Sequence, residues 1–421
     1  MVLQIASIST VAGRFFQPVL DLFALLTTSR QCPDLSDLEF IRLGVSRVLS
    51  QATSGRDFLQ AYAESGGKEV ENSHFFETLK SGRRLKLCEE LNRRLHEAVR
   101  QVREDPFAAH SELKGFDLHA GDGHYHKAAA HDKPIGDSKR PVGHFFMFDL
   151  RTSALHHLEL AETGGTRKGE HDMHVLKRTD IKTLRLGSGK GRKVMFVWDK
   201  AAIDFRFWRH AKQNGIYFIS REKDNMRLGT IGINAFDKAD PRNQGVISDE
   251  LVSTSTGVCL RRVVYHDPVG DVTYAYLTSE LNIPPGLVAL LYKRRWDIEK
   301  AFDETENKLQ EGKAWASSTT AKKIQGQFIA ITVNLLLLIE ARLEKVELIV
   351  NEPEIERRAE RLEEVETLLA KKGLVVPFVY SAIQRITQRG VKLIRWLRNH
   401  LYGNRPWSEA IGLLRKRYAA L

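Results

Sequence analysis

A short stretch of the sequence places an aromatic residue, an arginine and a glutamate at a spacing that suits phosphate chemistry. Tyr292, Arg295 and Glu299 stand at relative positions 0, 3 and 7. An α-helix turns once in about 3.6 residues, so the spacing predicts that these side chains share one strip of a helix, beside an apolar strip that can pack. A carboxylate there could hold a hard cation such as Mg2+, and the guanidinium could bind a phosphate bidentately.

Two aspartates far upstream each lie where a predicted strand meets a loop. Asp122 follows a strand predicted from residue 114 and sits in a Gly-Asp-Gly turn, and Asp199 follows the buried-strand pattern of residues 193–198. A few carboxylates that hold two metal ions can cleave a phosphodiester. Ordinary interpretations stand beside this one: a turn residue for Asp122, a helix N-cap for Asp199, and an ion pair along its helix for Glu299.

Two other aspartates compete for these roles. Asp117 lies five residues before Asp122 in the same predicted strand, and the odd offset predicts that it points to the opposite face. Asp204 begins the helix that is predicted after Asp199, where it can serve as a charge in the first helical turn.

Histidines also lie close to the first aspartate. His124 and His126 follow Asp122 in an His-x-His pattern, which can bind zinc. A zinc-dependent or other metal-dependent hydrolase is therefore a second interpretation. No ordered ligand motif follows downstream, so we interpret these histidines mainly as phosphate-facing or supporting residues.

Positive charge is concentrated near the C-terminal end. The chain has 421 residues and a formal net charge of +11, and the segment from Lys371 onward has eleven Lys or Arg residues against one acidic residue. Clustered cations favour a polyanion such as DNA, whereas a solvated surface helix is the alternative. The cations that follow three- and four-residue steps, and that we predict to contact DNA, include Arg385, Arg389, Lys392 and Arg395.

Length and composition limit the number of domains and the class of protein. The chain is long enough for roughly two to four modules. Its three cysteines contain no CxxC pair, which favours a reducing compartment and argues against disulfides or a thiolate zinc site. The longest apolar run, residues 328–339, is too short to span a bilayer, and no secretory leader is recognisable, so we expect no membrane partner.

The patterns divide the chain into successive segments. Residues 1–112 are predicted to be helical, with a basic second half that favours DNA contact. Residues 113–345 form a predicted core that begins with strand, hairpin, helix, strand, helix and strand, and residues 222–285 interrupt it with a β-rich insertion. Residues 346–421 are predicted to form a helical, basic module.

Together these features resemble the DDE transposases of the IS4 type. In that family the third catalytic carboxylate lies in a Tyr-x2-Arg-x3-Glu-x6-Lys signature. Tyr292, Arg295 and Glu299 match its first three positions, whereas Glu306 stands in place of the lysine. The resemblance covers residues 113–345 and implies an α/β protein: a ribonuclease-H-like core with the β-rich insertion, flanked by helical N- and C-terminal modules.

The resemblance also implies roles for the site residues. Asp122, Asp199 and Glu299 would be catalytic and would hold Mg2+ or Mn2+, and the two aspartates would converge at the ends of neighbouring central strands. Tyr292 and Arg295 would contact the DNA backbone.

The activity that the resemblance implies is DNA transposition. Such enzymes bind terminal inverted repeats, hydrolyse one strand to a 3′-OH, and join that hydroxyl to target DNA after a hairpinned intermediate. We therefore expect DNA as partner, a homodimer in the paired-end complex, and a place in the bacterial cytoplasm at the nucleoid. Because Glu306 departs from the signature, a catalytically silent DNA-binding repressor remains an alternative.

Overall fold

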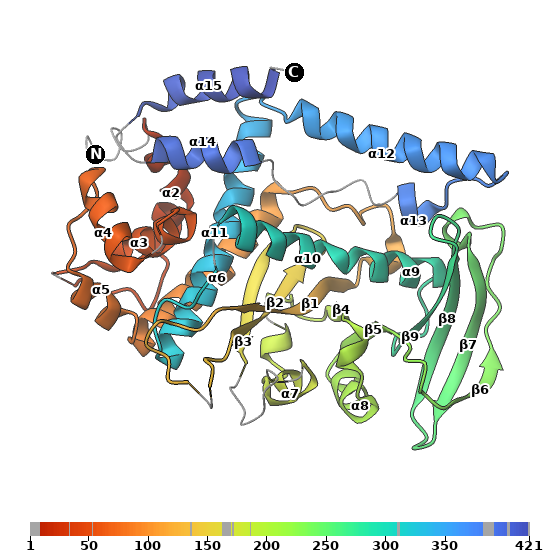
Figure 1. The fold of residues 1–421 in the computed structure, drawn as a ribbon. Coiled ribbons are helices and arrows are strands. Elements are labelled where there is room, and N and C mark those ends of the chain that lie inside the picture. The colour runs from red at the N-terminus through yellow and green to blue at the C-terminus, as the bar shows by residue number, and fades with distance from the viewer. Residues whose placement is uncertain are drawn as a thin grey trace.

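A nine-stranded mixed sheet organises the molecule, and helical segments from both ends of the chain flank it (Figure 1). The strand order is β3-β2-β1-β4-β5-β9-β8-β7-β6. The strands are β1 Phe116–His126, β2 Val142–Asp149, β3 Leu155–Leu160, β4 Lys193–Val197, β5 Ile216–Arg221, β6 Leu228–Ile233, β7 Val246–Thr254, β8 Cys259–Asp267 and β9 Val272–Thr278. The computed structural model describes residues 9–32, 34–52, 54–134, 137–161, 170, 172–185, 187–309, 312–381, 391–401 and 405–419.

Many helices begin at a hydroxyl side chain that accepts a backbone N–H, as at Ser36, Ser81 and Ser318. The α-helices are α2 Val11–Phe23, α3 Asp37–Leu49, α4 Gly55–Glu64, α5 Asn72–Thr78, α6 Gly82–Val102, α7 Asp172–Arg178, α8 Phe205–Gln213, α9 Pro285–Arg294, α10 Trp296–Asp303, α11 Thr319–Lys345, α12 Glu352–Lys371, α13 Phe378–Ser381, α14 Val391–Leu401 and α15 Trp407–Ala419. Shorter turns are η1 Ser111–Leu113, η2 Thr183–Arg185, η3 Lys200–Ala202, η4 Pro241–Asn243 and the π-helix η5 Glu304–Lys308.

The central half of the sheet has the predicted order of elements. β1, the β2–β3 hairpin, α7, β4, α8 and β5 follow one another along the chain. β1 pairs in parallel with β4, and β4 pairs in parallel with β5, whereas β2 is antiparallel to both β1 and β3. Helices α7 and α8 lie on one face of this sheet, and α10 and α11 lie on the other (Figure 1). Each face buries its own apolar cluster.

β1 is longer than the sequence pattern indicates. We expected the strand to end at Asp122, but it continues to His126 because antiparallel pairing with β2 extends as far as His126↔Val142. Only the pairing with β4 stops earlier, at Ala120↔Val197. Asp122 therefore lies inside a strand, just beyond the point where its parallel neighbour leaves the sheet.

The β-rich segment extends the same sheet. β9 pairs antiparallel with β5, and β8, β7 and β6 follow outward as antiparallel neighbours. β8 and β9 pair as a hairpin on either side of the turn that follows Asp267. This segment therefore places its strands directly beside the central half of the sheet.

Helix α11 forms much of the interior. It packs against α6, β3 and α3, and Phe328 lies against Phe40 with ring centroids 5.3 Å apart. Gly44 of α3 makes room for that ring, because a Cβ at this position would stand 2.1 Å from the Phe328 ring. By length and composition α11 could cross a membrane, but 89% of its most apolar window is buried inside the protein, which is also how the core helix of a globular protein behaves.

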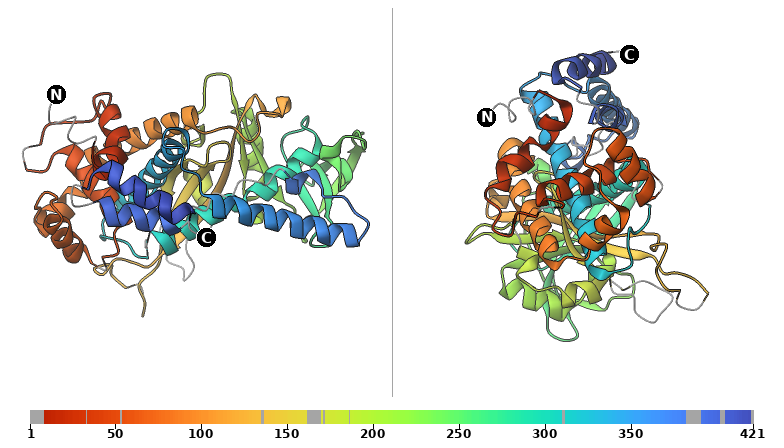
Figure 2. Two further views of the ribbon diagram at one scale, coloured as in Figure 1. Left: turned by 90° about the horizontal axis from the view of Figure 1, so that it is seen from above. Right: turned by 90° about the vertical axis from the view of Figure 1, so that its left-hand side faces the viewer.

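The C-terminal helices reach across the molecule. α12 runs from the end that holds α15 toward β7 and β8 (Figures 1 and 2). Beyond it, α13 docks against α9: the Tyr380 hydroxyl donates to the Asp267 carboxylate at 2.6 Å, and Lys293 of α9 binds the same carboxylate at 3.1 Å. α14 packs by an apolar face that includes Trp396 and Leu397. The C-terminal segment is therefore part of the packed structure.

Candidate active site

Asp122 on β1 and Asp199, two residues after the end of β4, lie at the same edge of the parallel β1–β4 pair. β1 and β4 pair in register from Phe116↔Lys193 to Ala120↔Val197. Continuing that register by two residues on each chain brings Asp122 opposite Asp199. Because side chains two residues apart point to the same face of a strand, the register predicts that both aspartates leave the sheet on the side of α10.

The helices that carry the signature residues cross this edge of the sheet. Pro285 stands in the first turn of α9, where its fixed φ suits a helix start. Ile298 and Phe302 bury the apolar edge of α10, and the Phe302 ring lies 5.0 Å from the ring of His124 on β1. This packing directs Arg295 and Glu299 toward Asp122.

Arg295 lies between two of the carboxylates. Its Nη1 atom is 2.6 Å from Glu299 Oε1 and 3.6 Å from Asp122 Oδ2. The guanidinium carbon lies 5.0 Å from the Trp296 ring and 5.9 Å from the Tyr292 ring. Burial lowers the pKa of Arg295, but Glu299, Tyr292 and Asp122 more than offset that effect, so its pKa is raised. The arginine is therefore held as a cation at the centre of the site.

Asp122 is held in an environment that resists its ionisation. Burial raises its pKa to about 7, although the Gly123 N–H, which donates to Asp122 Oδ1 at 2.8 Å, and Arg295 both lower it. The nearby carboxylates of Asp172 and Glu299 add to the rise. A carboxylate desolvated in this way gains much from a cation placed beside it.

Tyr292 connects Arg295 with the second aspartate. Burial raises the pKa of Tyr292; Asp199 adds to the rise, while Arg295 and Arg221 oppose it. The Tyr292 ring also packs on Tyr276 of β9, with centroids 4.8 Å apart. Asp122 and Glu299 thus flank one side of the Tyr292–Arg295 pair, and Asp199 lies within electrostatic reach of its other side.

The signature segment is not the single regular helix that its spacing predicts. α9 ends at Arg294, α10 begins at Trp296, and residues from Glu304 onward form a π-helix. A π-turn has more residues than an α-turn and so changes the direction of the side chains that follow it. Glu306 therefore does not lie two α-turns along the strip from Glu299. It is exposed, and it lies near His124. Burial lowers the pKa of His124, and the Glu306 carboxylate partly opposes that shift.

Two of the aspartates also have the structural role of a helix cap. Asp199 caps η3 by accepting the Lys200 N–H at 2.6 Å. Asp204 caps α8 by accepting the Phe207 N–H at 2.9 Å, and it pairs with Lys177. Asp204 therefore has a structural role in the helix that it begins.

Asp117, the other competing residue, faces away from the site. Its carboxylate pairs with Arg192 at 2.8 Å and Arg100 at 3.6 Å, and its odd offset from Asp122 places it on the opposite face of β1. This agrees with the face that its position in the sequence predicts.

Sequence reasoning missed a fourth carboxylate. Asp172, the first residue of α7, raises the pKa of Asp122, and its Oδ2 atom accepts the Trp198 indole N–H at 3.4 Å. The neighbouring Glu170 carbonyl accepts the Tyr125 hydroxyl at 3.0 Å, which ties this segment to β1. Nothing in the sequence around Asp172 marks it, because its relation to Asp122 depends on how α7 folds back onto the sheet.

The carboxylates suit a hard cation by type. Mg2+ and Mn2+ prefer oxygen ligands, and Asp122, Asp199 and Glu299 supply them from three elements. Across the residues that the structure describes, however, no group of three or more His, Cys, Asp or Glu side chains is arranged to hold a metal ion. The guanidinium of Arg295 occupies the space between two of the carboxylates instead.

Comparisons with known proteins show the family to which the chain belongs. Residues 113–335, slightly more than half of the chain, match the family described as the transposase DDE domain. The chain belongs to this family of transposases. It is also similar to a protein of Sinorhizobium fredii (strain NBRC 101917 / NGR234) named "Putative transposase y4zB", with 27% identity over 171 residues. That match covers 39% of this chain and 46% of the relative, so the chain spans about half the length of the curated relative it matches.

The histidines near the transposase site are buried and neutral. The rings of His126 and His144 lie tilted against each other with centroids 4.8 Å apart, and His144 Nδ1 lies 3.0 Å from His157 Nε2. Burial lowers the pKa of His126 to about 3 and that of His157 to about 4. For the alternative zinc interpretation of His124 and His126, the described parts of the chain contain no group of three or more suitable ligands. His144 and His157 on the neighbouring strands pack against α11, where a Cβ at Gly326 would stand 2.5 Å from the His157 ring.

The predicted C-terminal DNA contacts are placed only in part. Lys392 and Arg395 lie on α14, where Arg395 is exposed and the Lys392 amine donates to the Arg417 carbonyl at 3.2 Å. Arg385 and Arg389 lie outside the described residues. The two placed cations turn away from the buried apolar face of α14, where DNA could reach them.

The basic residues of the N-terminal module are largely engaged inside the protein. Arg83 and Arg84 both pair with Asp37, and Arg100 binds Asp149 at 3.0 Å. Paired cations of this kind stabilise the packing of α6 and are less available to DNA phosphates than free ones.

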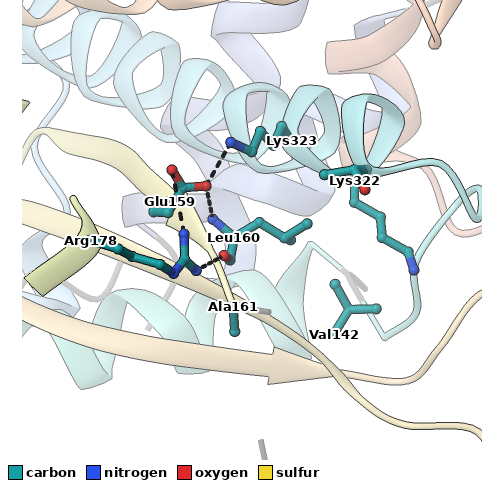
Figure 3. Close-up of a pocket in the computed structure, with 8 residues that line it drawn as sticks. Val142, Glu159, Leu160, Ala161, Arg178, Lys322 and Lys323 are labelled. Atoms are coloured by element: carbon teal, nitrogen blue, oxygen red, sulfur yellow. Dashed lines mark hydrogen bonds and ion pairs between the residues drawn. The ribbon is translucent and has the colours of Figure 1, made fainter. Parts of the chain in front are cut away.

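Two polar pockets border the core. One of about 330 Å3 lies beside the Asp199 end of the site and is lined by Lys200, Arg221, Glu222, Lys223, Asp224 and Asn225. The other, of about 290 Å3, lies where α7 and the start of α11 meet β3 (Figure 3). In this second pocket, Glu159 stands between Lys323, at 2.7 Å, and Arg178, at 3.8 Å. Its charges are therefore largely balanced within the protein.

Proposed function

We propose that this chain is an IS4-type transposase that cleaves the ends of an insertion sequence by metal-dependent phosphodiester hydrolysis and joins the 3′-OH to target DNA. Two observations carry the proposal: the β1–β4 register, continued by two residues, brings Asp122 opposite Asp199, and the Arg295 guanidinium links Glu299 to Asp122. The parallel β1-β4-β5 arrangement with its β2–β3 hairpin supports a ribonuclease-H-like core.

The proposed chemistry divides among a few side chains. Asp122, Asp199 and Glu299 would hold Mg2+ or Mn2+, which would activate the attacking oxygen and stabilise charge on the leaving oxygen. Arg295 would bind a phosphate near the cut, and Tyr292 would fix that guanidinium by packing beside it. The partners of the reaction would be terminal repeats and target DNA, bound by a homodimer at the bacterial nucleoid.

The direct test is cleavage of labelled DNA that borders the coding sequence, measured with Mg2+, with Zn2+ and with EDTA. We expect cleavage with Mg2+, no cleavage with EDTA, and a free 3′-OH at the cut. Cleavage supported by Zn2+ alone would contradict the proposal and favour the zinc-dependent hydrolase.

A DNA-binding repressor without turnover is the second candidate, and Glu306 favours it. This exposed carboxylate stands where the family signature has a lysine and would repel a DNA backbone. We expect Glu306→Lys to strengthen binding to pre-cut ends by about 0.5–2 kcal/mol and to raise the cleavage rate, as one charge-assisted contact would. Binding can be measured by fluorescence anisotropy. Tighter binding with no cleavage in either protein would instead support the repressor.

A further inference from the structure

In the free protein, the positive charge between the site carboxylates belongs to Arg295. Its Nη1 atom makes a close pair with Glu299 at 2.6 Å and a longer one with Asp122 at 3.6 Å. The residue is only 6% exposed, although its neighbour Trp296, which lies over the guanidinium, is 55% exposed. Arg295 therefore takes the place that a cation would need in order to bind both carboxylates.

One atom of this buried guanidinium lacks a partner. Arg295 Nε is shielded from solvent and makes no hydrogen bond within the described structure. A buried donor left in this state costs roughly 1–3 kcal/mol, so native proteins rarely retain one without a ligand or water to accept it. Arg295 Nε is therefore a buried donor that a phosphate entering the site would satisfy.

A divalent cation and Arg295 compete for the same oxygens. The guanidinium, at 2.6 Å from Glu299 and 3.6 Å from Asp122, lies where a cation bridging the two carboxylates would lie, and two cations held that close repel each other. A DNA phosphate offers Arg295 a bidentate anionic partner. Moving the guanidinium to that phosphate would free both carboxylates and would satisfy Nε.

We propose, on the basis of the function proposed above, that Arg295 is a latch that couples metal binding to DNA binding. Without DNA it holds Asp122 and Glu299 together and excludes the divalent cation. When a DNA phosphate accepts the guanidinium, the carboxylates become available to the metal. Because coupling between two ligands is reciprocal, the metal also strengthens DNA binding.

The first experiment measures Mn2+ binding without DNA. The electron paramagnetic resonance signal of free Mn2+ reports how much metal the wild-type protein, Arg295→Gln and Lys300→Gln bind. Lys300 is the matched control, since it lies on the same helix and its removal deletes one positive charge, but it pairs with Asp297 at 3.4 Å. We expect Arg295→Gln to bind Mn2+ at least about tenfold more tightly than the wild type, and Lys300→Gln to change little.

The second experiment adds a DNA duplex that borders the coding sequence. The wild-type protein should gain on the order of tenfold in Mn2+ affinity when the duplex saturates it, and Arg295→Gln should gain almost nothing. Arg295→Lys, which keeps the positive charge but lacks the planar fork of donors, should fall between them. Thermal unfolding of each protein establishes that it is folded, and the wild-type comparison with and without DNA decides the question even if Arg295→Gln does not fold.

The outcomes separate the latch from the proposed function. If Asp122→Asn and Glu299→Gln abolish Mn2+ binding but Arg295→Gln binds Mn2+ no better than the wild type, the carboxylates are metal ligands and the latch is wrong. If the wild type binds no Mn2+ with or without DNA, both the latch and the metal assignment are overturned. Equal Mn2+ affinity in wild type with and without DNA also refutes the latch.

Discussion

The charges of individual side chains in the site partly compensate one another. Asp122 is a desolvated carboxylate, and its close companions are Arg295, Glu299 and Asp172. A buried charge without a partner would cost several kcal/mol, so one cation among several carboxylates stabilises the free protein. The same crowding leaves an excess of negative charge that a metal ion would neutralise.

We predict that Asp122→Asn, Asp199→Asn and Glu299→Gln each reduce strand cleavage by about 100-fold or more, since the loss of a metal ligand is at least as costly as the loss of its support. DNA affinity measured without divalent metal should not fall, because these side chains would hold metal rather than phosphate. Cleavage of end-labelled DNA and anisotropy measure the two effects.

Asp204→Asn is the matched control for these variants. It removes a carboxylate that caps α8 and pairs with Lys177, and we expect full cleavage. If Asp204→Asn abolished cleavage while Asp199→Asn did not, the second aspartate of the site would be misassigned.

At the level of elements, local sequence patterns predicted several strands, whereas contacts between distant segments decided features that the sequence could not show. Short apolar runs were enough to predict β1, β4 and β5 and to place Asp199 just after a strand, because those signals are local. The sequence could not show that β1 continues past Asp122, since pairing with β2 decides this. It also gave no sign of the π-helix at Glu304, which shifts Glu306 away from the expected strip.

Asp172 illustrates the remaining limit. Its place near Asp122 arises from the packing of α7 against the sheet and from the Trp198 indole, none of which is adjacent in sequence. Arg295 is the opposite case: its spacing from Glu299 predicted the i,i+4 ion pair, and the structure adds the contact with Asp122. Sequence spacing therefore identifies partners within an element but not those contributed by another.

The contact between α11 and α3 should dominate the stability of the helical side. Phe328 is fully buried in the space that Gly44 leaves open. We predict that Phe328→Ala lowers the free energy of unfolding by about 3–5 kcal/mol, because the cavity cannot close against a rigid helix. Urea unfolding measures the change. Phe328→Leu, which keeps most of the volume, should cost only about 1–1.5 kcal/mol, and an equal loss in both variants would contradict the cavity argument.

Buried histidines should make the whole molecule sensitive to acid. Burial lowers the pKa of His119 to about 4, that of His126 to about 3 and that of His157 to about 4. The unfolded chain binds these protons near pH 6.5, and the folded chain does so only near pH 4 or below. Between about pH 4 and 6.5 the unfolded state therefore binds more protons than the folded state. The free energy of unfolding keeps its full value above pH 6.5 and decreases as the pH falls below it.

His119→Leu tests this linkage. The ring is completely buried, and neither of its nitrogens has a partner in the described structure. The variant should flatten the dependence of the free energy of unfolding on pH by up to about 1.4 kcal/mol per pH unit between pH 4 and 6.5. Urea unfolding across that range measures the slope. The exposed His210→Gln should leave it unchanged, and a slope unaltered in His119→Leu would show that other groups cause the acid sensitivity.

The distribution of charge over the whole molecule leads to the last prediction. The excess of cations lies after Lys371, but α14 is packed by Trp396 and Leu397, so deleting this segment would damage the fold as well as the charge. Lys392→Gln with Arg395→Gln removes two cations and leaves the apolar face intact. Because each phosphate contact releases about one counterion, this double variant should weaken binding to all DNA sequences and reduce the slope of log affinity against log salt by about 2.

Arg357→Gln on α12, which removes an exposed arginine paired with Glu354, is the control and should leave the slope unchanged. An unchanged slope in the α14 pair would mean that DNA does not reach this helix, and that the basic C-terminal surface either serves subunit pairing or is simply solvated.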